Sequence, residues 1–282
     1  MSTLAHIENL RVAFRTDEGS LREVVRGVSF TLGREKLGIV GESGSGKSIT
    51  GRSLLGVLPP YAQMTADRLT FGNIDLLRAS PKLRRSLRGG RMGMILQDPK
   101  FSLNPVMRIG EQIVEAIRIG DRRIGGRLAR QRALQTLEAV HIREPERVAR
   151  LYPHELSGGM GQRVMIAMMV VREPDLLIAD EPTSALDVTV RTQVLSILDE
   201  LVTRRGMGLI FISHDLNLVA KFCDRVLVMY AGAIVETLEA SRLREAKHPY
   251  TQGLLSCLPT INGSLDPLPV LKREGSWAEP VR

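Results

Sequence analysis

Apolar residues along the chain gather in short runs that are separated by longer segments with helical periodicity. The runs consist mostly of Val, Ile, Leu and Met, and they predict buried strands at residues 37–40, 92–96, 175–179, 208–213 and 226–230. Between them, residues 47–57 and 162–171 have the pattern of helices. Strands that alternate with helices favour a mostly parallel sheet covered by helices, so the pattern predicts an α/β fold.

Three other segments complete this picture. Residues 5–31 alternate between apolar and polar positions around a turn at 17–20, which indicates short strands. Residues 111–141 carry apolar side chains at three- and four-residue spacing, which predicts a helical segment with one polar face inside an insertion at about 98–163. From about residue 247 the chain is rich in proline, so we expect a less compact tail.

Composition narrows the class of protein. The 282 residues are 43% hydrophobic and 25% charged, which excludes disordered and fibrous chains. No apolar run approaches the roughly 18 residues of a membrane span, and no secretory start is visible. Two cysteines are too few for a disulfide framework. A net charge of +8 suggests phosphates or nucleic acid, but eleven aromatic residues are too few for a base-stacking platform.

A phosphate-binding motif carries the first chemistry. Residues 41–48 read Gly-Glu-Ser-Gly-Ser-Gly-Lys-Ser and match the P-loop pattern between a predicted strand and a predicted helix. Glycines let backbone N–H groups turn toward phosphate oxygens, and the helix start adds a positive dipole end. Lys47 is expected at the β- and γ-phosphates and the Ser48 hydroxyl at Mg²⁺. The alternative is a flexible turn, but a chance match is about one in a hundred.

Two carboxylates, Asp180 and Glu181, follow the apolar run at 175–179. A strand parallel to the one before the P-loop would bring Asp180 to the magnesium. Neighbouring strand residues point to opposite faces, so we assign Asp180 as a metal ligand and Glu181 as the base that orients or deprotonates water. Two solvated acids at a strand end are the alternative.

Three further polar positions have weaker local signals. Gln97 follows the strand at 92–96 and can contact both metal and water. His214 follows the strand at 208–213, where an imidazole can contact the γ-phosphate. Ser157, Gly158 and Gly159 precede a helix and form a second candidate phosphate-binding helix start. The alternatives are a surface glutamine, a turn or cap histidine, and an ordinary helix cap.

In chain order, these motifs resemble the complete motif set of the ATP-binding cassette (ABC) ATPases: the P-loop, Gln97, residues 156–160, residues 176–181, residues 184–187 and His214. The resemblance covers residues from about 5 to 245. It implies a P-loop NTPase (RecA-like) core with an antiparallel β subdomain and an inserted helical subdomain. We therefore predict an ATP-binding domain at 1–246, with its helical subdomain at about 98–163, and a tail at 247–282.

The same resemblance assigns further residues. Two cassettes of this family close head to tail around two ATP molecules, so that Ser157, Gly158 and Gly159 of one chain face the nucleotide of the other. Asp187 would communicate across that dimer. Phe14 stands where the family has its adenine-stacking aromatic, with a core phenylalanine as the alternative. The predicted nucleotide-binding residues are Phe14, Gly41, Ser43, Gly44, Ser45, Gly46, Lys47, Ser48, Ile49, Ser157, Gly158, Gly159 and Asp187.

Within the family, residues 97–105, 152–160 and 248–255 are similar to the ATPases of peptide and nickel importers. Met160 replaces the commoner glutamine, as in the first of the two different ATPases of such importers, which favours a heterodimer. Gly161 departs from the usual arginine and could soften the contacts beside the signature. Some relatives have a cysteine cluster near the C-terminus, whereas this tail has only Cys257, so we predict no iron–sulfur centre.

The resemblance implies an ATP-hydrolysing importer subunit for peptides or a nickel-type chelate, with ATP and Mg²⁺ as cofactors. Catalysis is expected from Glu181, His214 and Gln97, and metal ligation from Ser48, Gln97 and Asp180. The expected partners are a second, different ATPase subunit, two membrane permease subunits and an extracytoplasmic substrate-binding protein, with no nucleic acid. The expected location is peripheral, at the cytoplasmic face of the inner membrane.

Two other functions fit parts of the sequence. The basic charge suggests a soluble ABC ATPase that acts on nucleic acid or ribosomes, although a long coiled coil, zinc cysteines and a tandem cassette are missing. The second alternative is the cassette of an exporter. Exporters often have membrane spans fused to the cassette, and this sequence shows none. The cargo itself is selected by other chains, so this sequence does not identify it.

Overall fold

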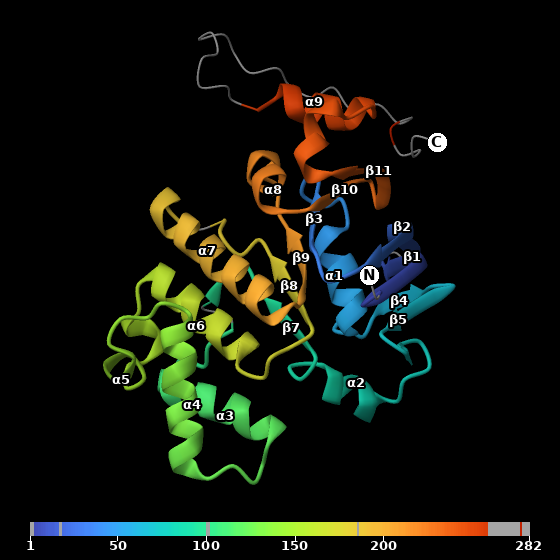
Figure 1. Ribbon diagram of the computed structural model, residues 1–282. Helices are drawn as coiled ribbons and strands as arrows, with labels where there is room; N and C mark the ends of the chain where they lie inside the picture. Colours follow the sequence, from blue (N-terminus) through green and yellow to red (C-terminus); the bar gives the residue numbers. More distant parts are fainter. Residues whose placement is uncertain (1–2, 17–18, 100–101, 185, 259–276, 278–282) are drawn as a thin grey trace. The chain divides into compact units, whose positions relative to one another are not determined.

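The computed structural model describes residues 3–16, 19–99, 102–184, 186–258 and 277 (Figure 1). The chain forms two compact units, which are Met1–Ala79 with Phe211–Arg282 (unit 1) and Ser80–Ile210 (unit 2). Phe101 and Ala185, which belong to two of the motifs, lie outside the described residues, as do most of the tail prolines. Among the described residues, no helix has both the length and the apolar character that a membrane span requires.

Unit 1 contains an antiparallel sheet at the start of the chain. Strand β1 (Ala5–Arg15) pairs with β2 (Leu21–Leu32), which confirms the strands predicted at residues 5–31. β1 also pairs with β4 (Ala62–Thr65) and β5 (Arg68–Phe71), and β5 pairs with β6 (Ile74–Asp75). Leu10, Val12 and Val25 are completely buried in this sheet, as alternation along the two strands requires.

The rest of unit 1 surrounds strand β3 (Lys36–Val40), which pairs in parallel with β10 (Arg225–Tyr230). β10 pairs in turn with the antiparallel β11 (Ala233–Glu239). Just beyond β9 (Gly208–Ile212), the Ser213 N–H donates to the Ile39 carbonyl at 3.1 Å, so β3 and β9 end at the same edge. The described residues of this unit also form α1 (Lys47–Leu55), α8 (Leu216–Phe222), the 3₁₀ segment η3 (Ala240–Glu245) and α9 (Pro249–Ser256).

Unit 2 has two parallel strands, β7 (Met92–Ile95) and β8 (Leu176–Asp180). Ile95 is opposite Ala179, so the carboxyl ends of both strands lie side by side. All five residues of β8 are buried, which confirms the fully buried strand predicted from its continuous apolar run. Helices α2 (Pro81–Leu87), α6 (Gly158–Val170) and α7 (Val188–Arg205) also belong to this unit.

The structure confirms that residues 111–141 are mostly helical, and it divides them between two helices. The structure has α3 (Ile109–Gly120) and α4 (Gly126–Ala139), which pack against each other, followed by the short α5 (Pro145–Val148) and the 3₁₀ turn η2 (Pro153–Glu155). The Asp121 side chain accepts a hydrogen bond from the Arg123 N–H at 3.0 Å and forms a turn where α3 ends. Apolar spacing continues across the break because both helices bury one face.

The expectation of a less compact tail is wrong for its described part. Helix α9 starts with a proline in its first turn, where the missing N–H has no cost. Tyr250 and Thr251 are completely buried, so this helix is part of the core of unit 1.

Candidate functional site

The predicted phosphate loop connects β3 to α1, as the motif requires. Gly41, Gly44 and Gly46 have φ angles of 148°, 83° and 98°, a region that residues with a Cβ seldom occupy. At Gly41, a Cβ would lie 2.1 Å from the Met229 carbonyl oxygen, whereas at Gly44 it would meet nothing within 4 Å. The loop is therefore packed against β10 at its start and open around its middle.

Lys47 begins α1 with its side chain directed back over this loop. Its ammonium group donates to the carbonyl oxygens of Gly41 at 2.8 Å and Glu42 at 2.7 Å, and the residue is only 7% exposed. Gly46 is the N-cap of α1 and provides no side-chain acceptor, and the start of a helix favours a bound anion. The Ser45 hydroxyl oxygen is buried and has no hydrogen-bond partner within the described part of the chain. A cation, a helix start and an unsatisfied hydroxyl fit a bound polyphosphate.

His214 lies at the same edge of unit 1 as this loop, because β3 and β9 end together. Its side chain is exposed. The helix cap that was an alternative for His214 is provided by its neighbour: the Asp215 carboxylate accepts from the Leu218 N–H at 3.0 Å. Asp215, and not His214, therefore provides the cap of α8.

Phe14 lies on β1 and is only half-buried, so it is not a core ring. It contacts Tyr61, with ring centroids 5.9 Å apart, and Tyr61 is 64% exposed. No motif in the sequence pointed to Tyr61. Its position directly after a Pro-Pro pair and before a polar strand gave no periodic signal. An exposed tyrosine beside a predicted base-stacking aromatic is nevertheless a second surface on which a base can stack.

In unit 2, the parallel pairing of β7 and β8 brings Gln97 and the two acids to one edge of the sheet. Asp180 ends β8 and is 5% exposed, while Gln97 is exposed two residues beyond β7. Glu181 has a φ of 50°, a left-handed conformation that is strained for a residue with a side chain. The chain therefore leaves the extended conformation of β8 between Asp180 and Glu181.

The chemistry of the predicted metal ligands fits Mg²⁺. The carboxylate of Asp180, the amide oxygen of Gln97 and the hydroxyl of Ser48 are all hard oxygen ligands. No nitrogen or sulfur donor is among them. The set therefore favours Mg²⁺ over zinc or copper.

Ser157, Gly158 and Gly159 form the start of α6. The Ser157 hydroxyl accepts from the Met160 N–H at 3.4 Å, and both Ser157 and Gly158 are exposed. A Cβ on Gly159 would lie 2.4 Å from Val190 of α7, so this glycine allows the two helices to pack closely. Asp187 caps α7 through the Val190 N–H at 2.9 Å. The signature segment and Asp187 are thus joined through Val190.

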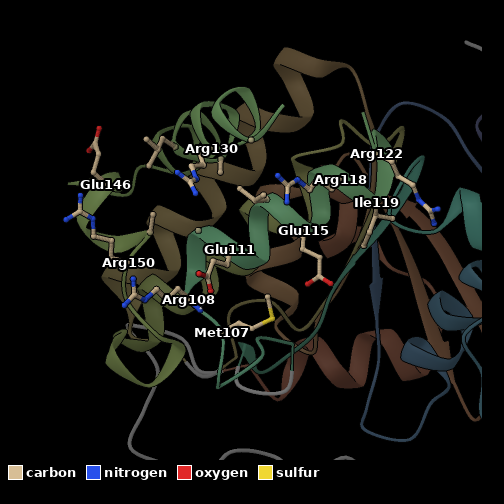
Figure 2. A pocket seen from close by; sticks show the side chains of 16 residues that line it. Met107, Arg108, Glu111, Glu115, Arg118, Ile119, Arg122, Arg130, Glu146 and Arg150 are labelled. Atoms are coloured by element: carbon tan, nitrogen blue, oxygen red, sulfur yellow. Dashed lines mark hydrogen bonds between the residues drawn. The ribbon is translucent and has the colours of Figure 1, made fainter. Parts of the chain in front are cut away.

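A second feature of unit 2 is a hollow of about 930 Å³ beside α3, α4 and α5 (Figure 2). Its charged lining consists of Arg108, Arg118, Arg122, Arg130, Arg150, Glu111, Glu115 and Glu146. Ile119, at its rim, is an apolar side chain that is 66% exposed. Mixed charges around exposed apolar groups are typical of a surface that binds another protein.

Sequence comparison relates most of this chain to known proteins. The family profile described as "ABC transporter" matches residues 25–184. The dipeptide transport ATP-binding protein DppD of Bacillus subtilis is 44% identical over 265 residues, covering 93% of this chain and 78% of that protein. A putative peptide import ATP-binding protein of Brucella abortus is 46% identical over 281 residues, covering 99% of this chain and 83% of the relative.

Solved structures agree with these relatives. The dimeric structure of a bacterial ABC transporter cassette superimposes with a TM-score of 0.75 at 26% identity, over 84% of this chain and 98% of that one. A post-hydrolysis state of the same cassette, bound to ADP and phosphate, also gives a TM-score of 0.75, at 25% identity. The chain therefore belongs to the ABC transporter family and is one of its ATPase cassettes.

Proposed function

We propose that the chain is the ATP-hydrolysing subunit of an importer for peptides. The similarity to dipeptide and peptide import ATP-binding proteins, which extends over 93% and 99% of the chain, supports this function. The ATPase function is supported by the glycine-rich phosphate loop, over which the Lys47 ammonium group is held by two hydrogen bonds. An ATPase for nucleic acid has only the net charge in its favour.

In this proposal, Lys47 and the backbone N–H groups from Ser43 to Ile49 hold the β- and γ-phosphates of ATP. Ammonium and amide donors are effective there because the loop backbone is already bent by its glycines. His214 contacts the γ-phosphate, and Phe14 stacks on the adenine.

Ser48, Gln97 and Asp180 are the proposed Mg²⁺ ligands. Bound Mg²⁺ neutralises charge that develops on the phosphate oxygens. Glu181 orients the attacking water and accepts its proton, and the strained backbone at this residue sets the direction of the carboxylate.

The proposed assembly contains two cassettes and two permease subunits at the cytoplasmic face of the membrane, with an extracytoplasmic binding protein that delivers the cargo. Ser157, Gly158 and Gly159 face the ATP of the second cassette, and Asp187 lies at the contact between cassettes. The hollow beside α3 and α4 takes a cytoplasmic helix of a permease, whose charges complement the arginines and glutamates there. ATP closes the pair of cassettes and hydrolysis reopens it.

Two variants of the purified chain test the ATPase assignment. Lys47→Ala is expected to abolish ATP retention, whereas Glu181→Gln is expected to bind ATP, hydrolyse it slowly and accumulate a closed dimer. Normal ATP affinity in the first variant, or hydrolysis at the parent rate in the second, would overturn these roles. Peptide import itself requires that the chain co-purifies with permease subunits and that added peptide and binding protein stimulate its ATPase.

A further inference from the structure

Helix α9 reaches the phosphate loop through the hydroxyl group of Tyr250. The Glu42 N–H donates to this oxygen at 3.0 Å, although the two residues are 208 positions apart in the chain. Tyr250 is completely buried, and the bond lies within unit 1. None of the roles proposed above uses this residue.

The hydrogen bond with Tyr250 involves the Gly41–Glu42 peptide group, which also binds the Lys47 side chain. The Gly41 carbonyl and the Glu42 N–H belong to one peptide, and in a trans peptide the two bonds point in opposite directions. The carbonyl accepts from the Lys47 ammonium at 2.8 Å while the N–H donates to Tyr250. This peptide is therefore held on both sides, and its N–H bond also strengthens its carbonyl as an acceptor.

The hydrogen bond from the Glu42 N–H to Tyr250 restrains a flexible part of the loop, because the residue before Glu42 is a glycine. Gly41 has a φ of 148°, and free rotation about glycine would let the peptide turn away from Lys47. Tyr250 removes that freedom before the nucleotide arrives, so the loop does not have to be ordered during binding.

Helix α9 is itself fixed in place. The carboxylate of Glu236 on β11 accepts from the N–H groups of Lys247 at 2.7 Å and His248 at 3.2 Å, and His248 caps the helix. The Tyr250 ring packs on Tyr230 with centroids 4.5 Å apart, and Trp277 lies 6.0 Å from Tyr250. The tyrosine hydroxyl is thus presented to the loop from a rigid support.

We propose that Tyr250 is a positioning residue for ATP, and that the C-terminal segment which carries it sets the nucleotide affinity of the cassette. The inference rests on the proposed ATP-binding role of the phosphate loop. The tail then has a function at the phosphate loop. A partner that displaces α9 would also break the hydrogen bond that restrains the Gly41–Glu42 peptide.

The test is Tyr250→Phe in the full chain, which removes one oxygen atom and keeps the ring. Tyr230→Phe is the matched control, because its ring lies in the same cluster and its hydroxyl makes no hydrogen bond to any described residue. Equilibrium titration with Mg-ATP and Mg-ADP should show binding about three- to tenfold weaker for Tyr250→Phe, with a matching rise in KM and kcat changed less than twofold. Tyr230→Phe should bind like the parent.

Equal nucleotide affinity in Tyr250→Phe and the parent would overturn the proposal, even if the variant melts at a lower temperature, because the residue would then be structural only. If Tyr250→Phe does not fold, Glu236→Ala provides the test, because this substitution loosens the start of α9. Unchanged ATP affinity in folded Glu236→Ala would also overturn the proposal. Failure of the parent to bind ATP would instead reject the proposed function.

Discussion

The side chain of Lys47 allows the sharpest quantitative prediction. Lys47→Met keeps a long apolar stem and removes the ammonium group, which donates to the carbonyls of Gly41 and Glu42. ATP binding exchanges these two neutral acceptors for phosphate oxygens. A hydrogen bond to a charged acceptor contributes about 1 to 2 kcal/mol more than one to a neutral acceptor, so two such exchanges are worth about 2 to 4 kcal/mol.

This difference corresponds to ATP binding that is about 30- to 1,000-fold weaker. Isothermal titration calorimetry with Mg-ATP measures it directly, and AMP provides a comparison because it lacks the phosphates that Lys47 contacts. Lys221→Met is the matched control, since Lys221 is an exposed lysine on α8 in the same unit. A loss smaller than about threefold, in a variant whose circular dichroism matches the parent, would refute the assignment of Lys47 to the phosphates.

Other predictions concern separate parts of the chain. Glu181→Gln should lower kcat by about 10²- to 10⁴-fold while ATP affinity stays within threefold of the parent, and an affinity loss as large as the rate loss would contradict a role in activating water. Gly41→Ala should destabilise the chain by more than about 1 kcal/mol in urea unfolding, because its Cβ would lie 2.1 Å from the Met229 carbonyl; unchanged stability would show that the loop start relaxes freely. Burial raises the pKa of the Cys223 thiol to about 12, so this thiol should stay neutral and resist iodoacetamide at pH 8 until the chain is unfolded; rapid native alkylation at Cys223 would contradict its burial.

The sequence predicted the strands of the parallel sheet well because each is a short and continuous apolar run. Strand β8, with all five residues buried, is the clearest case. Strands β4 and β6 were missed for the converse reason. β4 consists of Ala, Gln, Met and Thr with no residue fully buried, and β6 has only two residues, so neither has the alternation that marks a strand.

The break between α3 and α4 and the helix at the start of the tail were not predicted, for different reasons. The break between α3 and α4 leaves the apolar spacing intact, so only the turn chemistry of Asp121 and the glycines at 125 and 126 indicated it. In the tail, Pro249 was interpreted as a sign of loose structure, yet proline is favoured in the first turn of a helix, and His248 before it provides the cap.

The site shows the same limits. Motif spacing predicted which residues follow β3, β7, β8 and β9, and the structure places them at the carboxyl ends of those strands. The hydrogen bond between Glu42 and Tyr250 could not be predicted in this way, because no local pattern links residues that are 208 positions apart. The contact between Phe14 and Tyr61 likewise depends on the pairing of β1 with β4.

Uptake of labelled peptide tests the central claim most directly. Membrane vesicles that contain the chain together with its permease subunits are loaded with Mg-ATP on the cytoplasmic side, and accumulation of labelled di- and oligopeptides is measured for the parent chain and for Lys47→Ala. We expect ATP-dependent accumulation with the parent chain and only background uptake with Lys47→Ala. Equal uptake by the two would contradict the conclusion that ATP held by this chain drives import.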